Sequence, residues 1–236
     1  MIAAGPDGPS TMRQTGPVDG DVDWEQVPGS VRAAVDRGLR RAQRDALDEV
    51  EQILDAALRV VERVAPAEPR VADIVAEAGT SNQTFYRYFA GKNDLLHAVM
   101  ERGTLRVCSY LRHQMDKHTA PESRVGAWVE GLLAQLVRPD IARPSMALSR
   151  LTLPVGIGQP DRAKLGDLLG DLLVEPFAAA GRPRPDLDAR AVQHTVVGAI
   201  TRHIGAGTVP DEAEVRHLVD FCTAAVAGRP TATGDE

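Results

Sequence analysis

The stretch from Val71 to Leu96 constrains the fold more than any other part of the chain. It begins with apolar residues at the spacings of one buried helical face, namely Val71, Ile74, Val75 and Ala78. Gly79 follows, and glycine readily takes the positive φ that the C-terminal cap of a helix requires. Ser81 is a natural N-cap, because its hydroxyl can accept from the first free amides of a following helix. The pattern therefore predicts two helices joined by a tight turn.

The second helix is predicted from Asn82 to Phe89, with one buried and one exposed face. Phe85 and Phe89 are four residues apart and share the buried face. The exposed face and the leading end then carry polar side chains, those of Asn82, Gln83, Thr84, Tyr86 and Arg87. Amide, hydroxyl, phenol and guanidinium groups on a short exposed helix suit reading of the DNA major groove. We therefore expect a helix-turn-helix that binds double-stranded DNA.

The pattern DIVAEAGTSNQTFYRYFAGKNDLL resembles the signature of the TetR family of transcriptional regulators, and the resemblance extends over about Asp45 to Met100. It implies that Tyr86, Tyr88 and Lys92 contact DNA phosphates. Tyr88 could instead be a half-buried packing residue. The pattern departs from the family at Arg70, where a capping Ser or Thr is common, and at Ala72, where some relatives carry a base reader. Arg70 cannot accept from helix amides, although it could still contact a phosphate.

Base reading is expected mainly from the leading end of the second helix. Asn82 and Gln83 can make paired bonds to adenine, and Arg87 can do so to guanine if it faces the bases. A solvated surface arginine is an equal alternative for Arg87. The complete set of predicted DNA-binding residues is Arg70, Ser81, Asn82, Gln83, Thr84, Tyr86, Arg87, Tyr88 and Lys92.

Composition and patterning predict an all-α protein of about nine helices. The chain of 236 residues is 43% hydrophobic but only 4% aromatic, which favours helices over sheets. We expect a disordered acidic tail over residues 1–30, a helix-turn-helix domain over residues 31–100, and a ligand-binding and dimerisation domain over residues 101–236. No apolar run is long enough to span a membrane and the start lacks a secretory pattern, so a cytoplasmic protein is expected.

The net charge of −6 argues at first against a nucleic-acid partner. Residues 1–32 hold five acidic residues against two arginines, so half of the total charge lies in the predicted tail. A basic cluster follows immediately, made of Arg37, Arg40, Arg41 and Arg44. A local basic face of this kind can bind DNA although the whole molecule is acidic.

One recognition helix reads too few base pairs to select a genomic site, so we expect a homodimer on a palindromic operator. The last two predicted helices carry apolar stripes that could pair in a four-helix bundle between subunits. The interface residues predicted from these stripes are Val192, Val196, Ile200, His203, Val215, Val219 and Cys222. The alternative is that the stripes face the core of their own subunit.

The resemblance implies a small-molecule pocket in the C-terminal domain, whose filling separates the two DNA-binding heads of the dimer. Segments expected to converge offer Trp128, Met146, Leu148, Leu151, Phe177 and His194 as its lining. Each of these could equally be an ordinary core residue. Walls of this type favour a lipophilic effector.

Other chemistries find little support in the sequence. The histidines lack the spacing of a shared metal site, and neither a nucleophile elbow nor a phosphate-binding loop occurs. We therefore expect no enzyme, no metal and no cofactor. The leading interpretation is a dimeric repressor released from DNA by a ligand. The alternative is a helical ligand-binding or interaction protein that retains the domain without sequence-specific DNA binding.

Overall fold

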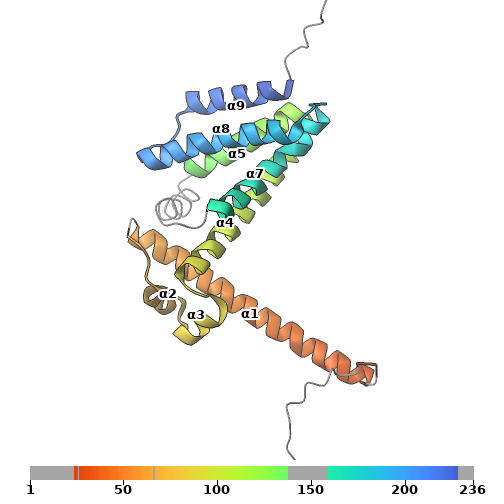
Figure 1. Ribbon diagram of the computed structural model, residues 1–236, viewed down its shortest axis with the longest axis vertical. Coiled ribbons are helices and arrows are strands. Elements are labelled where there is room, and N and C mark those ends of the chain that lie inside the picture. Colours follow the sequence, from red (N-terminus) through yellow and green to blue (C-terminus); the bar gives the residue numbers. More distant parts are fainter. Residues whose placement is uncertain (1–23, 26, 66, 138–158, 228–236) are drawn as a thin grey trace, which may run out of the picture. The chain divides into compact units, whose positions relative to one another are not determined.

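The computed structural model describes residues 24, 25, 27–65, 67–137 and 159–227, with the side chains of residues 159–163 left out. Every regular element within these residues is an α-helix, and none of them is a strand (Figure 1). The all-α prediction is confirmed. About nine helices were expected, and the described part of the chain holds eight.

The helix bounds follow the sequence pattern closely. In chain order the helices are α1 (Gly29–Val64), α2 (Val71–Ala78), α3 (Asn82–Tyr88), α4 (Lys92–Met115), α5 (Pro121–Val137), α7 (Gln159–Ala179), α8 (Pro185–Ala206) and α9 (Glu212–Ala227). None of the helices in the described residues is both long and apolar enough to cross a membrane.

Residues 1–47 and residues 48–236 form two separate units. In the first unit the described structure is mainly the N-terminal part of α1. Every side chain from Val31 to Asp45 is exposed, and no other described element covers this part of the helix. A helix without such cover gains little from burial, so its stability rests on propensity and on continuity with the rest of α1.

The second unit contains two apolar cores. The first core, called here the head core, gathers side chains from the C-terminal half of α1 and from α2, α3 and α4. Its buried members are Ile53, Leu54, Ala56, Ala57, Val60, Ile74, Val75, Ala78, Phe85, Phe89, Leu95 and Val99. Burial of this apolar surface holds the short helices α2 and α3, which would be unstable alone at their length.

The second core, called here the bundle core, joins α4, α5, α7, α8 and α9. Trp128 of α5 is fully buried there, and its indole Nε1–H donates to the carbonyl oxygen of Leu169 at 3.1 Å. Helix α7 packs on α8, and α5 packs on α9. Helix α4 contributes to both cores, with Leu95 and Val99 in the head core and Leu111 and Met115 in the bundle core. The domain boundary predicted at residue 100 thus falls inside a continuous helix.

Candidate DNA-binding site

The turn between α2 and α3 has the geometry that its sequence predicts. Gly79 lies in the left-handed region at φ 63° and ψ 29°. Its N–H donates to the carbonyl oxygen of Ala76, and the N–H of Thr80 donates to that of Val75 at 3.1 Å. Two carbonyl groups at the end of α2 are satisfied in this way, so the chain can turn sharply into the next helix.

Ser81 caps α3 as predicted. Its side-chain oxygen accepts from the backbone N–H of Thr84 at 3.0 Å. The same oxygen lies 3.0 Å from the hydroxyl oxygen of Thr84. A cap of this kind contributes about 0.5–2 kcal/mol. Ser81 was also predicted to bind DNA, and its side chain here serves the helix.

Helix α3 presents a buried aromatic face and an exposed polar face. Phe85 is fully buried and Phe89, which caps the helix, is 6% exposed, and their ring centroids lie 5.7 Å apart. On the other side, Tyr86 is 59% exposed. The exposed face includes an open hollow of about 530 Å³ whose lining is Gln83, Thr84, Tyr86 and Arg87. Four of the predicted DNA-binding side chains therefore lie together on one rigid helix.

Two of the predicted DNA-binding residues, Arg87 and Tyr88, are bound to a carboxylate of α1. Arg87 Nη2 donates to Glu49 Oε2 at 2.9 Å, and the Tyr88 hydroxyl donates to the same oxygen at 2.7 Å. The Arg87 guanidinium also lies 4.9 Å from the centroid of the Tyr88 ring. The hydrogen bond to Glu49 raises the pKa of the Tyr88 phenol above its ordinary value. Glu49 thereby fixes the direction of both side chains.

Lys92 begins α4 and pairs with a carboxylate that precedes α2. Its Nζ lies 2.5 Å from Glu68 Oε2, and the Lys92 side chain is 28% exposed. Next to it, Asp94 Oδ2 accepts from the N–H of Ala90 at 2.9 Å, which closes the loop between α3 and α4. The lysine is thus held at the first turn of a helix, where the helix dipole adds positive potential.

Arg70 precedes α2 without capping it. Its backbone is extended at φ −98° and ψ 144°, and its side chain makes no capping hydrogen bond. This agrees with the expectation that a guanidinium cannot accept from helix amides. Arg70 and Asn82 are both exposed, so they are available to an external ligand.

A polar network between α1 and α2 supports the site and was not foreseen. Arg59 and Arg63 of α1 each donate at 2.8 Å to the carboxylate of Glu77. The hydrogen bonds from Arg63 and then Arg59 lower the pKa of that carboxyl. Gln52 Nε2 donates to the carbonyl oxygen of Ala78 at 2.7 Å, next to the capping glycine. Helix α2 is therefore oriented by polar contacts as well as by the head core.

Comparison with known proteins agrees with this geometry. Residues 53–99 match the family described as "Bacterial regulatory proteins, tetR family", and they span the head core from Ile53 to Val99. These residues form a TetR-family domain. The HTH-type transcriptional regulator BetI of Brucella suis (strain ATCC 23445 / NCTC 10510) is 27% identical over 190 residues, which cover 77% of this chain and 93% of BetI. The chain is accordingly a DNA-binding transcriptional regulator.

Solved structures show the same fold. A transcriptional regulator from Rhodococcus sp. RHA1 (RHA1_ro04179) has a TM-score of 0.62 at 16% identity, covering 77% of this chain and 99% of that one. FadR of Bacillus subtilis, solved in complex with stearoyl-CoA, has a TM-score of 0.54 at 16% identity, covering 75% and 97%.

The predicted ligand-binding residues are not all brought together. Trp128 and Phe177 have no exposed surface and share the bundle core. His194 lies on an exposed position of α8 and is not part of that core. The remaining three predicted residues, Met146, Leu148 and Leu151, lie outside the described residues.

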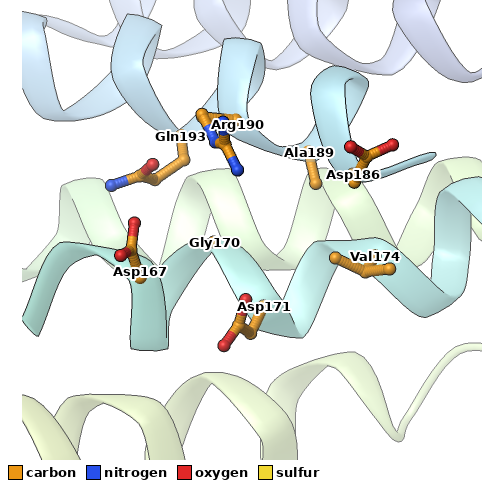
Figure 2. Close-up of a pocket in the computed structure, with 8 residues that line it drawn as sticks. All are labelled: Asp167, Gly170, Asp171, Val174, Asp186, Ala189, Arg190 and Gln193. Atoms are coloured by element: carbon orange, nitrogen blue, oxygen red, sulfur yellow. The ribbon is translucent and has the colours of Figure 1, made fainter. Parts of the chain in front are cut away.

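A polar hollow of about 270 Å³ lies between α7 and α8, and the sequence did not predict it (Figure 2). Four residues from each helix line it, namely Asp167, Gly170, Asp171, Val174, Asp186, Ala189, Arg190 and Gln193. Gln193 is 5% exposed, and its Nε2 donates to the carbonyl oxygen of Gly166 at 3.2 Å. Val174 and Ala189 also contact the bundle core, so the hollow borders that core directly.

Four of the predicted interface residues are buried within their own chain, and three of them, Val192, Val196 and Cys222, belong to the bundle core. Val196 and Cys222 have no exposed surface and Val192 is 4% exposed. Burial raises the pKa of the Cys222 thiol to about 11. His203 is 6% exposed, with Nδ1 2.8 Å from Thr208 Oγ1 and Nε2 3.0 Å from a Glu214 oxygen.

A side chain enclosed by its own subunit offers little surface to a second chain, so the exposed sides of α8 and α9 offer more surface for an interface than these four positions do. Ile200, Val215 and Val219 are half-buried against the same core, and they can contribute only at an edge.

Proposed function

We propose that this TetR-family regulator is a dimeric repressor that a small-molecule effector releases from a palindromic operator. The observation that carries the proposal is the polar row on α3, where Gln83, Thr84, Tyr86 and Arg87 line one open hollow. The cap at Ser81 and the buried ring of Phe85 hold this row rigidly. A short rigid helix with a polar face matches the width of the major groove.

Within this proposal the leading end of α3 reads bases and its flanks bind the backbone. Asn82 and Gln83 are exposed, and their side chains make no hydrogen bond to any described residue. Their amides are therefore free to pair with adenine edges. Lys92 and Arg70 bind phosphates on either side, and Lys92 exchanges Glu68 for the phosphate. Such contacts set register and orientation but carry no sequence information.

Dimerisation uses the exposed sides of α8 and α9. Small and polar residues recur on α8 at helical spacing, at Ala191, His194, Gly198 and Thr201, and all four are exposed. On α9 the largest exposed apolar side chain is Phe221, at 60%. Small side chains allow helices to approach closely, and an exposed aromatic ring is a typical anchor of an interface.

Changing Phe221 to Glu tests the interface, because a carboxylate replaces its central apolar group. The expected results are a halved mass in solution and loss of high affinity for the full palindrome, with half-site binding retained. Thr195→Glu, on the half-buried side of α8, introduces the same negative charge and serves as the control for Phe221→Glu. An unchanged dimer mass for Phe221→Glu would place the interface elsewhere.

The effector is proposed to be a lipophilic molecule that enters the bundle core. FadR of Bacillus subtilis was solved with stearoyl-CoA, and its fold resembles this one. In this chain the polar hollow between α7 and α8 borders the apolar core and holds three carboxylates against one guanidinium. The negative charge of this lining opposes binding of an anionic head group in the polar hollow. A neutral or cationic amphiphile should therefore raise the thermal midpoint more than an acyl-CoA of equal chain length.

Operator binding is the direct test of the proposed function. The full-length protein is titrated against its own upstream intergenic DNA and against random DNA at about 0.15 M salt. A palindrome bound far more tightly than random DNA supports the repressor proposal, and genome-wide selection of bound fragments covers an operator that lies elsewhere. Absence of any preferred sequence in both assays would overturn it.

The alternative function, a helical interaction protein that no longer reads DNA, is favoured by two observations. Arg70 fails to cap α2, and Arg87 already has a carboxylate partner in the free protein. The same operator titration separates the two proposals, because the alternative predicts equal affinity for all sequences.

A further inference from the structure

We propose that the N-terminal part of α1 is a second DNA-binding surface, which grips phosphates through four arginines outside the helix-turn-helix. The surface consists of Arg37, Arg40, Arg41 and Arg44, called here the arginine surface. The inference rests on the proposed DNA-binding function and extends it, because it assigns affinity to a segment that precedes the family match at residue 53.

The four arginines lie on one side of the helix. Their separations of three, four and seven residues place them within an arc of about 100° at 3.6 residues per turn. Together with Asp45 they line one open hollow of about 490 Å³ on the surface. All four side chains are exposed. The geometry therefore gathers four guanidinium groups into one continuous positive strip about 10 Å long.

The arginine surface has no protein partner among the described residues. None of its four guanidinium groups makes an ion pair or a hydrogen bond there, although Asp36 and Asp45 lie close in sequence. Many other arginines of the chain behave differently. Ion pairs to Asp or Glu are made by Arg59, Arg63, Arg87, Arg102, Arg106, Arg124, Arg182, Arg184, Arg202 and Arg216. A protein with a net charge of −6 thus leaves four adjacent cations uncompensated.

A DNA backbone supplies the anions that such a strip fits. One strand offers a phosphate about every 3.4 Å along the helix axis, so a strip of about 10 Å faces several phosphates. Guanidinium groups bind phosphate oxygens through two parallel hydrogen bonds, which a lysine cannot reproduce. Each neutralised phosphate releases condensed counterions, and affinity becomes steeply dependent on salt.

An anionic membrane is the competing partner, because the opposite side of the helix is apolar. Val31, Val35 and Leu39 are 47%, 37% and 58% exposed and lie away from the arginine surface. Basic amphipathic helices of this pattern also bind lipid surfaces. DNA is favoured because α1 continues without a break into the head core, where Ile53 and Leu54 help to hold α2 and α3.

The test compares salt dependence of DNA binding for the full-length protein and a variant with all four arginines changed to Gln. The slope of log affinity against log salt should become less negative by about 3 to 4 per subunit, since each phosphate contact contributes about 0.9. Affinity at about 0.15 M salt should fall at least tenfold on operator and on random DNA alike. The variant with four lysines should retain most of the slope.

Two controls make the outcome decisive. A variant with Arg112, Arg184, Arg202 and Arg216 changed to Gln carries the same charge change outside α1 and should keep the wild-type slope. Circular dichroism checks that α1 remains helical in each variant. A slope equal to the wild-type value in the helical four-Gln variant would overturn the proposal. The proposal would also be overturned if the four-Gln variant lost binding to vesicles containing phosphatidylserine but kept its DNA binding intact.

The test also separates this inference from the proposed function. Changing Asn82 and Gln83 together to Ala should remove the preference for operator over random DNA and leave the slope unchanged. A wild-type protein without any sequence preference would defeat the repressor proposal, yet the arginine surface could still be judged on random DNA. The two proposals therefore fail through different measurements.

Discussion

The two positively charged regions of this protein treat their cations in opposite ways. In the head, Arg87 and Lys92 are bound to Glu49 and Glu68. In the N-terminal part of α1, the four residues of the arginine surface have no partner among the described residues. Carboxylates fix the direction of a cation but must be displaced by a phosphate, whereas an unpaired arginine keeps its full charge for the ligand.

This difference suggests that the head supplies the geometry of DNA binding and that the arginine surface supplies charge. Exposed ion pairs are worth only about 0–1 kcal/mol, so Glu49 costs the head little affinity and still orients Arg87 and Tyr88. The arginine surface would contribute affinity to every DNA sequence equally. Sequence preference should then depend on the head alone, and salt dependence should depend largely on α1.

The largest effect is expected from Phe85→Ala. Removal of a fully buried ring should destabilise the head by about 3–5 kcal/mol, because a cavity replaces packed aromatic contacts. Hydrogen exchange of the amides in α2 and α3 measures the loss, together with urea unfolding. Operator preference should disappear while weak, salt-dependent binding persists through the arginine surface. Retention of operator preference would show that α3 does not carry it.

The single changes Asn82→Ala and Gln83→Ala should each reduce the free-energy preference for operator over random DNA by about 1–3 kcal/mol. The reason is that each removes one pair of hydrogen bonds to a base edge. Competition titrations against operators with single base changes locate the affected position. Asn93→Ala, an exposed amide on α4, provides the control and should change nothing. Equal losses on every sequence would exclude Asn82 and Gln83 as readers.

Ser81→Ala should cost about 1 kcal/mol, because the N–H of Thr84 loses its acceptor at the start of α3. Amide exchange at Thr84 and Phe85 should accelerate, and operator affinity should fall by a similar free energy. Ser81→Asp keeps an oxygen acceptor at the cap and should restore most of the protection. If Ala and Asp behave alike, the cap does not stabilise the recognition helix.

The smallest effect is expected from Glu49→Gln. Loss of the carboxylate should lower the pKa of Tyr88 toward its ordinary value, because its hydrogen bond to Glu49 is what raises that pKa. An ultraviolet absorbance titration of the tyrosines at alkaline pH measures the change. Affinity for random DNA should rise, by fivefold at most, as Arg87 is freed from its pair.

Glu62→Gln supplies the matched control for this change. It removes an equal charge from an exposed position of the same helix, where the carboxylate has no partner among the described residues. If both variants raise affinity for random DNA equally, general charge rather than the pair explains the effect.

Local sequence signals predicted the turn and both of its helices because each depends on neighbouring residues. Gly79, Ser81 and the pair Phe85 and Phe89 act within a few positions of the chain, and the structure confirms their geometry. The partners of the exposed side chains were not predictable in this way. Glu49 lies 38 residues before Arg87, and Gln52 lies 26 residues before Ala78. An acidic or amide residue on an exposed helical face carries no signal of the cation or carbonyl that it will meet.

The interface on α8 and α9 shows a different limit of sequence reading. Apolar residues at helical spacing indicate that a face is buried, but not what buries it. Val196 and Cys222 lie in the bundle core of their own chain, and the spacing alone could not distinguish that burial from burial by a second subunit. The same reasoning applies to Trp128 and Phe177, whose periodicity fits a core residue as well as a pocket wall.

Helix α4 also limits how such regulators can be recombined. It supplies buried residues to the head core up to Val99 and to the bundle core from Leu111 onward, and between Val99 and Cys108 none of its residues is buried. Arg102 and Arg106, which lie in this interval, form ion pairs with Glu51 of α1. A chimera that grafts this head onto the sensor of a relative should therefore be joined after Arg106. A junction nearer residue 100 would replace Arg102 and Arg106 by residues of the relative and leave Glu51 without its partners.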